Sequence, residues 1–322
     1  MFSRMKRPSP FGPNIKLSFR PTIGTNGRVP KAAQPWPMES AFLHMFILTP
    51  EEGFASEEEA EAFFTKYMTP GKKPKFPKPT NPRHQAQEVA YQGWEKRSAR
   101  ARAKAAQSAL DVSPDAVDAY LLLAHDAPSW EETFELETKA LSAAERLLGP
   151  DPFTQYKDAF WGAAITRPFM RARLALGYTL WRQHNLADAI GHCKDLLRLN
   201  PGDNQGVRYI LAALLLEMGE NGEALRLIGE YSQDALSHWS FNRTLLHFRR
   251  QGDRPAARDL LNQALRCNPL VPAFLLGKRP IDSWEIEHVD IGEESEAIEY
   301  THLYKEAWRM TKGALEWLDR VK

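Results

Sequence analysis

The segment NPGDNQG, residues 200–206, has the composition of a ligand-binding loop, with two glycines, Asp203 and amide side chains between apolar segments. A glycine-rich loop ahead of a helix can bind an anion through its free backbone amides, and clustered side-chain oxygens can bind calcium. The surrounding segments favour another interpretation. Pro201 ends one helical hairpin, Gly202 and Asp203 turn the chain, and residues 204–206 start the next helix. The alternative is a small anion site formed by backbone amides of this loop.

Other residues that could do chemistry are scattered. The chain has nine histidines and two cysteines, Cys193 and Cys267, and none of them has metal-ligand spacing or forms a CxxC pair. The acidic run at residues 287–300 lacks the ligand pattern of a calcium loop and is typical of a helix start. The motifs HExxH, GxSxG and GxxxxGK[ST] are missing. We therefore expect no enzyme activity, no metal and no cofactor.

Charge is balanced overall but is divided into zones along the chain. The 322 residues include 42 Lys and Arg and 41 Asp and Glu. Residues 1–40 hold seven basic residues and one acid, Glu39, whereas residues 111–160 hold eleven acids and three basic residues. No apolar run approaches the roughly 20 residues that cross a bilayer. We expect a cytoplasmic protein without a membrane partner, with organelle import through residues 1–38 as the alternative.

Composition divides the chain into four parts. Residues 1–38 are basic and proline-rich, which is typical of a disordered arm. Residues 39–68 predict a short helical segment, in which Ser56 and Glu59 have the spacing of a capping box. Residues 69–83 contain prolines and lysines without an acid and predict a stiff linker. Residues 84–322 have helical periodicity and predict one repeat domain.

The helical part contains an internal repeat. Three segments align on Ala189, Ala224 and Ala257, which are 35 and 33 residues apart, and each alanine follows a polar turn that is itself preceded by an apolar helix. Small residues at Gly177 and Ala189 indicate a close approach of two paired helices. This pattern predicts an all-α fold, a tetratricopeptide-like solenoid of helical-hairpin repeats. A C-terminal capping helix is expected to bury Trp308 and Trp317, with the use of these rings by a partner as the alternative.

A family resemblance is carried by five stretches in the same order, which are SPDAVDAYLLLA, FWGAAITRPFMRARLALGYTLW, LRLNPGDNQGVRYILAALL, CNPLVPAFLLGKRP and ESEAIEYTHLYKEAWRMTKGALEWL. Between residues 85 and 318 the chain resembles bacterial tetratricopeptide proteins related to the eukaryotic suppressor of tumorigenicity seven family. The resemblance implies an all-helical repeat fold and an adaptor role. It implies no catalytic residues.

In tetratricopeptide proteins the first helix of each repeat lines a concave groove. The candidate groove residues here are Arg171, Tyr178, Trp181, Arg182, Tyr209, Asn242, Arg243, Arg249 and Arg250. Arginines beside aromatic rings suit an acidic or carboxylate-bearing peptide, and they also suit stacked nucleic-acid bases. Two alternatives remain: Trp181 and Tyr209 belong to the core between repeats, or Arg171 and Arg173 pair with the acidic zone.

These observations favour a non-catalytic adaptor or scaffold that binds a protein or peptide through its concave face. The alternative is an RNA-binding protein that uses the basic arm and the linker. The sequence does not indicate an oligomeric state.

Overall fold

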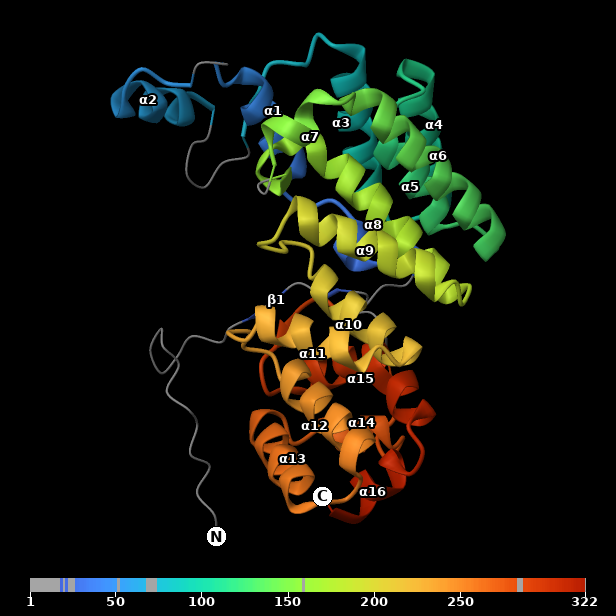
Figure 1. Cartoon of the computed structure of the whole chain (residues 1–322). Coiled ribbons are helices and arrows are strands. Elements are labelled where there is room, and N and C mark those ends of the chain that lie inside the picture. The colour runs from blue at the N-terminus through green and yellow to red at the C-terminus, as the bar shows by residue number, and fades with distance from the viewer. Residues whose placement is uncertain are drawn as a thin grey trace. The chain divides into compact units, whose positions relative to one another are not determined.

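The computed structural model describes residues 18–19, 21–22, 27–50, 53–67, 74–157, 160–282 and 286–321. Within these residues the regular structure consists of sixteen α-helices, three short 3-10 helices and two two-residue strands (Figure 1). The fold is therefore all-α, as the periodicity predicts.

The chain forms two compact units, which are Gly27–Leu214 and the combination of Met1–Asn26 with Leu215–Lys322. The division falls inside α10 (Val207–Met218), a helix whose apolar residues continue across the boundary. Residues 84–322, predicted as one repeat domain, are thus shared between two compact units, and the domain boundaries stay a prediction. Because no change of composition marks a boundary inside a helix, the sequence pattern does not reveal it.

The unit Gly27–Leu214 is built on helical hairpins. Its elements are η1 (Lys31–Ala33), α1 (Glu39–Leu48), α2 (Glu57–Tyr67), α3 (Pro82–Trp94), α4 (Ala99–Val112), α5 (Val117–His125), α6 (Trp130–Leu148), α7 (Asp151–Gln155), η2 (Phe160–Gly162), η3 (Ala164–Thr166), α8 (Arg167–Arg182) and α9 (Leu186–Leu199). Consecutive helices pack as the pairs α3 with α4, α5 with α6, and α8 with α9. The first helices of these pairs also touch one another, α3 with α5 and α5 with α8.

Small residues and polar caps explain these hairpins. The α3, α4 and α5 helices meet over buried alanines, which allow the backbones to approach closely. Asn81, Ser98 and Ser129 accept hydrogen bonds from backbone amides in the first turns of α3, α4 and α6. A Cβ atom at Gly177 of α8 would lie 3.1 Å from the Cβ of His192 on α9. The predicted close contact of these two helices is confirmed.

The N-terminal expectations hold only in part. Val29 and Ala33 are fully buried, so residues 27–38 are not a disordered arm; most of residues 1–26 lie outside the described residues. The composition of the segment does not reveal that these two apolar residues are buried in the core. Two helices form between residues 39 and 67. Ser56 Oγ accepts from the Glu59 amide at 3.1 Å, as the predicted capping box requires, whereas Glu59 Oε2 accepts from the Ala55 amide at 2.8 Å in place of the Ser56 amide. Residues 74–79 of the expected linker have no regular structure.

The second unit continues with hairpins and ends in helices that close its core. Its elements are β1 (Ser18–Phe19), α11 (Asn221–Glu230), α12 (His238–Gln251), α13 (Pro255–Cys267), α14 (Val271–Leu275), β2 (Val289–Asp290), α15 (Glu294–Met310) and α16 (Ala314–Val321). The β1 strand pairs antiparallel with β2, with Ser18 opposite Asp290. The Thr22 amide then donates to Glu299 Oε1 at 2.6 Å. An N-terminal stretch of the chain therefore belongs to the C-terminal unit.

The C-terminal helix buries aromatic residues, as predicted. Trp308 of α15 and Trp317 of α16 are fully buried, and the Trp317 ring stacks on Phe248 of α12 with ring centroids 4.6 Å apart. The α16 helix packs on α12, α14 and α15. Among the described residues, no helix combines the length and apolarity needed to cross a membrane.

Candidate functional site

A buried charge cluster lies between α1, α3, α5 and α8 in the unit Gly27–Leu214. Arg171 of α8 donates to both carboxylate oxygens of Asp118 on α5, through Nε at 2.8 Å and Nη2 at 2.7 Å. Its Nη1 donates to Glu39 Oε1 on α1 at 3.0 Å, and Nη2 also donates to the hydroxyl of Tyr91 on α3 at 2.8 Å. One guanidinium thus joins four helices that are remote in sequence.

The rest of the cluster balances its charge. Arg167, one turn before Arg171, lies 3.5 Å from Glu39 Oε1 and donates to the Trp161 carbonyl at 2.9 Å. Two guanidiniums therefore face two carboxylates, Glu39 and Asp118. Burial lowers the pKa of Arg171, but Asp118 and the other neighbours raise it by more. The cluster is paired and buried, so it holds the four helices together.

Arg171 was expected to line an exposed groove, and that expectation is wrong, because its side chain is fully buried among these partners. The pairing with Asp118, a residue of the acidic zone, matches the structural alternative for Arg171. Arg173 does not follow that alternative. It pairs instead with Asp195 of α9, and both side chains are partly exposed.

The aromatic candidates of the same unit are also interior. Tyr178, Trp181 and Tyr209 are buried, which matches the alternative that Trp181 and Tyr209 belong to the core. Tyr178 and Trp181 touch edge to face, with ring centroids 6.0 Å apart. Arg182 is exposed, and its guanidinium lies 6.0 Å from the centre of the Trp130 ring. Of these four candidates only Arg182 is accessible to a partner.

In the second unit Asn242 is buried and Arg249 is half-buried. Asn242 Oδ1 accepts from the Tyr300 hydroxyl at 3.0 Å, so its predicted place in a groove is wrong. Arg249 donates to the Leu216 carbonyl at 2.8 Å and to the Ala307 carbonyl at 3.0 Å, near the ends of α10 and α15. Burial lowers its pKa. Arg249 also lines an open cavity of about 580 Å³.

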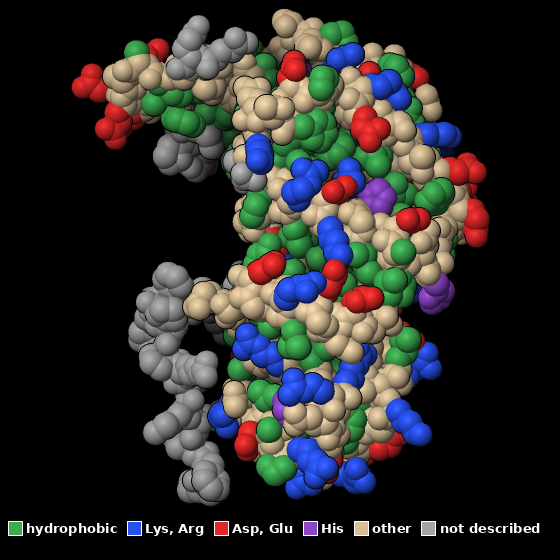
Figure 2. Space-filling view, in the orientation of Figure 1, with side chains coloured by type: hydrophobic (Ala, Val, Ile, Leu, Met, Phe, Trp, Pro, Cys, Tyr) green, Lys and Arg blue, Asp and Glu red, His purple; other side chains and the backbone are tan. Residues whose placement is uncertain are grey.

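Arg243 and Arg250, the remaining two candidates, are exposed on α12. Arg254, at the N-terminus of α13, and Arg266, within α13, were not predicted from the sequence and are exposed as well. We call Arg243, Arg250, Arg254 and Arg266 the α12–α13 arginines. Arg258 pairs with Asp253 at 2.7 Å, whereas none of the α12–α13 arginines forms an ion pair with any described residue. Basic side chains outnumber acidic ones on the side of this unit that Figure 2 shows.

A sequence signal for this surface exists. Residues 238–267 contain six arginines and two acids, Asp253 and Asp259. Counting charge hairpin by hairpin, in place of selecting residues by their expected place in a groove, finds the four arginines together.

In the loop at residues 200–206, the carboxylate of Asp203 binds backbone amides that an external anion could otherwise bind. Asp203 is buried and has a positive φ of 47°. Its Oδ1 accepts from the Val207 amide at 2.7 Å, and its Oδ2 accepts from the Arg208 amide at 3.0 Å and from Arg208 Nη1 at 2.8 Å. The amides at the start of α10 are therefore already occupied by a carboxylate. The predicted turn between two helices is confirmed, with α10 beginning at Val207, and the amides of Val207 and Arg208 are not available to an external anion.

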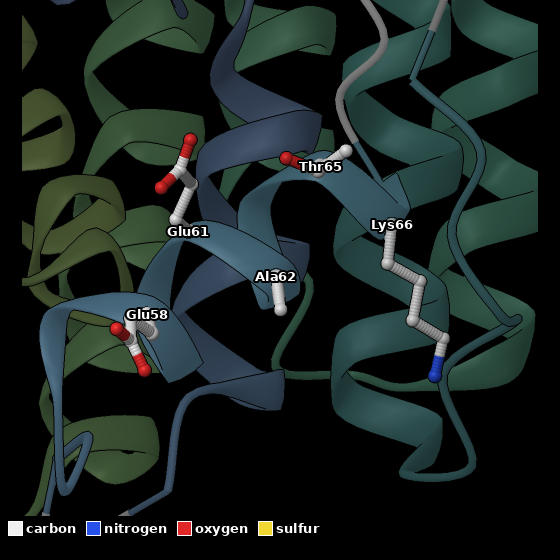
Figure 3. Close-up of a pocket in the computed structure, with 5 residues that line it drawn as sticks. All are labelled: Glu58, Glu61, Ala62, Thr65 and Lys66. Carbon is white, nitrogen blue, oxygen red and sulfur yellow. The ribbon is translucent and has the colours of Figure 1, made fainter.

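The described part of the chain contains no group of three or more His, Cys, Asp or Glu residues placed to hold a metal ion. A shallow cavity of about 540 Å³ lies on α2, beside Glu58, Glu61, Ala62, Thr65 and Lys66. Figure 3 shows that these side chains leave the helix in different directions and do not converge on a common point.

Comparison with known proteins gives distant relatives. The Protein ST7 homolog of Drosophila pseudoobscura pseudoobscura is 25% identical over 262 residues, which are 73% of this chain and 48% of that protein. The Suppressor of tumorigenicity 7 protein-like of Bos taurus is 25% identical over 255 residues, 71% of this chain and 45% of its own length. The human protein of the same name is 25% identical over 255 residues, 71% of this chain and 44% of its own.

These similarities support the family resemblance, and the chain spans less than half the length of the curated relatives it matches. No protein-family model matches the chain. No solved structure matches it either.

Proposed function

We propose that this chain is a non-catalytic adaptor, built from tetratricopeptide-like helical hairpins and related to the suppressor of tumorigenicity seven proteins. Its partner is a protein segment rich in Asp and Glu, and its contact surface is the set of α12–α13 arginines. The observation that carries the proposal is that four exposed guanidiniums on one hairpin lack a carboxylate partner among the described residues. Two cysteines without a disulfide support a cytoplasmic setting.

The chemistry of arginine supports an acidic partner. A guanidinium is always charged and presents a planar fork that fits a carboxylate through two hydrogen bonds. One exposed ion pair contributes only about 0.2–1 kcal/mol, so a single arginine would bind little. Several unpaired charges of one sign act together, because they also attract and orient an acidic partner before contact. We expect fast association that weakens as salt is added.

Nucleic acid is the second candidate, and the same arginines favour it, because their forks also fit phosphates. Most of residues 1–26 of the predicted basic arm lie outside the described residues, and Val29 and Ala33 are buried, so the arm adds no structural support to RNA binding. RNA binding and acidic-peptide binding differ in their competitors. A protein partner resists nuclease and is displaced by an acidic peptide, whereas an RNA partner is removed by nuclease.

The proposal is tested by affinity capture from the native host with nuclease-treated extracts. Wild-type chain is compared with the fourfold variant R243E/R250E/R254E/R266E and with the matched control R97E/R100E/K104E/K139E. The control residues are exposed positions in the other unit, and their reversal changes net charge by the same amount. We expect partners that the control retains and the fourfold variant loses. Identical partner sets for all three proteins would overturn the assignment.

A further inference from the structure

Residues 27–48 lie along the face that the first helices of the hairpins form in the unit Gly27–Leu214. The α3, α5 and α8 helices are the first members of their pairs and contact one another in that order. The segment reaches all three: α1 packs on α3, Arg28 bonds to the end of α5, and η1 packs on α8. In Figure 1 the blue segment before α1 passes beside α8. The chain itself thus covers the face where a partner peptide was expected.

The first contact is made by Arg28. Its amide donates to the His125 carbonyl at 3.0 Å, and its guanidinium donates to the carbonyls of Ala127 and Pro128, both at 2.7 Å. The same guanidinium lies 4.6 Å from the centre of the Trp130 ring, a cation–π contact. The turn between α5 and α6 therefore recognises one extended residue through its backbone and its side chain.

The next contacts select for small residues. A Cβ atom at Gly27 would lie 2.2 Å from Cε1 of His125, so a larger residue does not fit there without a shift. Ala32 and Ala33 are buried in η1 beside α8. The Ala32 carbonyl accepts from Gln205 Nε2 at 3.2 Å. Because both alanines are buried, longer side chains at these positions would overpack the contact of η1 with α8.

The last contacts require an aromatic ring and a carboxylate. Trp36 packs on Trp161, with ring centroids 5.8 Å apart. Glu39 then approaches Arg171 and Arg167. Without Glu39, two largely buried guanidiniums would share Asp118 alone, and an unbalanced buried charge is costly. An occupant of this face must therefore bring its own carboxylate to that position.

We propose that this face is a peptide-binding groove and that residues 27–48 are its occupant within the same chain. The groove recognises a sequence pattern in the order and spacing of Gly27, Arg28, Ala32, Ala33, Trp36 and Glu39. A partner segment with this pattern would compete for the groove and release the N-terminal segment. This inference goes beyond the α12–α13 arginines and rests only on contacts within the unit Gly27–Leu214.

The test uses the full chain with specific protease sites inserted between Thr22 and Gly27 and between Pro50 and Gly53, so that the contacts of β1 and Thr22 no longer tether the segment after cleavage. After cleavage, a fluorescein-labelled synthetic peptide of residues 27–50 is added in excess, and its binding is followed by fluorescence anisotropy. We expect binding to the cleaved chain and none to the uncleaved chain, where the tethered segment competes at high effective concentration. Peptides with Glu39→Gln or Gly27→Ala should bind about tenfold more weakly or worse. Met38→Ala changes an exposed side chain and is the matched control.

Two results would contradict the proposal. One is a Glu39→Gln peptide that binds as tightly as the native peptide. The other is a cleaved chain that fails to take up the peptide or loses its helical circular dichroism, because residues 27–48 would then be a permanent part of the core. Neither result bears on the α12–α13 arginines, so the two proposals fail separately.

Discussion

Glu39 and Arg171 are 132 residues apart in the chain, yet Glu39 Oε1 lies 3.0 Å from Arg171 Nη1, and their side chains are 1% and 0% exposed. Glu39 is the only acid among the first 40 residues, and Arg171 also contacts Tyr91 of α3 and Asp118 of α5. This ion pair attaches the N-terminal segment to α8. It also explains why an arginine selected as a binding residue is inaccessible.

Replacing Arg171 should strongly destabilise the chain. Arg171→Met leaves Glu39 and Asp118 buried without their main cation, which costs about 3–5 kcal/mol in the free energy of unfolding. The matched control is Arg173→Met on the same helix, where the partly exposed pair with Asp195 contributes about 1 kcal/mol or less. Urea denaturation followed by circular dichroism measures both. Equal losses for the two variants would contradict the cluster's role.

Glu137 should make stability fall as pH rises. It is fully buried on α6, and burial raises its pKa to about 8, a rise that the hydroxyl of Thr179 lessens. The folded chain therefore keeps a proton that the unfolded chain loses above its ordinary pKa. The contribution is complete below about pH 4.5 and is lost up to about pH 8, with a slope near 1.4 kcal/mol per pH unit.

The variant Glu137→Gln tests that slope. Gln does not titrate, so its free energy of unfolding should fall less steeply than wild type between pH 5 and pH 8. Any constant cost of burying the amide shifts the whole curve and leaves its slope unaffected. Parallel curves for the two proteins would show that Glu137 is already ionised in the folded chain.

Removing the carboxylate of Asp203 should create the anion site that the native loop lacks. Asp203→Gly tolerates the positive φ and frees the amides of Val207 and Arg208, at a cost of about 1–2 kcal/mol. Formate should raise the melting temperature of this variant more than that of wild type. The comparison is made at matched ionic strength with chloride. A wild-type chain stabilised equally by formate or phosphate would disprove the assignment.

The two cysteines should react differently with a maleimide. Cys193 is fully buried, and burial raises the pKa of its thiol, whereas Cys267 is half-buried near Ser240. We expect one labelled thiol in the native chain, two in denaturant and none in native Cys267→Ser. Mass spectrometry counts the labels. Rapid native labelling of Cys193 would mean that α9 opens readily.

Much of the helical architecture could be predicted from local patterns. Ala189, Ala224 and Ala257 are all fully buried, as their alignment predicts, because a repeated contact between helices requires a repeated small residue. The N-terminal segment was predicted poorly. Its composition is that of a disordered arm, but Val29 and Ala33 are buried by helices that come more than eighty residues later, and no local window contains that information.

The candidate site residues could also be predicted only where local sequence decides their environment. Exposed residues such as Arg243 and Arg250 could be selected from charge and helical position alone. Arg171 and Asn242 could not be judged in this way, because their partners Asp118 and Tyr300 are 53 and 58 residues away. A polar residue on a helix faces a groove or a buried partner according to which distant residue meets it, and one sequence does not say which.

The most direct test of the adaptor proposal is a binding titration with a fluorescein-labelled peptide of alternating Glu and Ala. Anisotropy is measured for wild type, R243E/R250E/R254E/R266E and R97E/R100E/K104E/K139E at low and high salt, with single-stranded RNA of equal charge as competitor. We predict that wild type and the matched control bind the peptide, that salt weakens binding, and that the fourfold variant does not bind. Equal affinity for all three proteins, or binding to the RNA alone, would contradict the proposal.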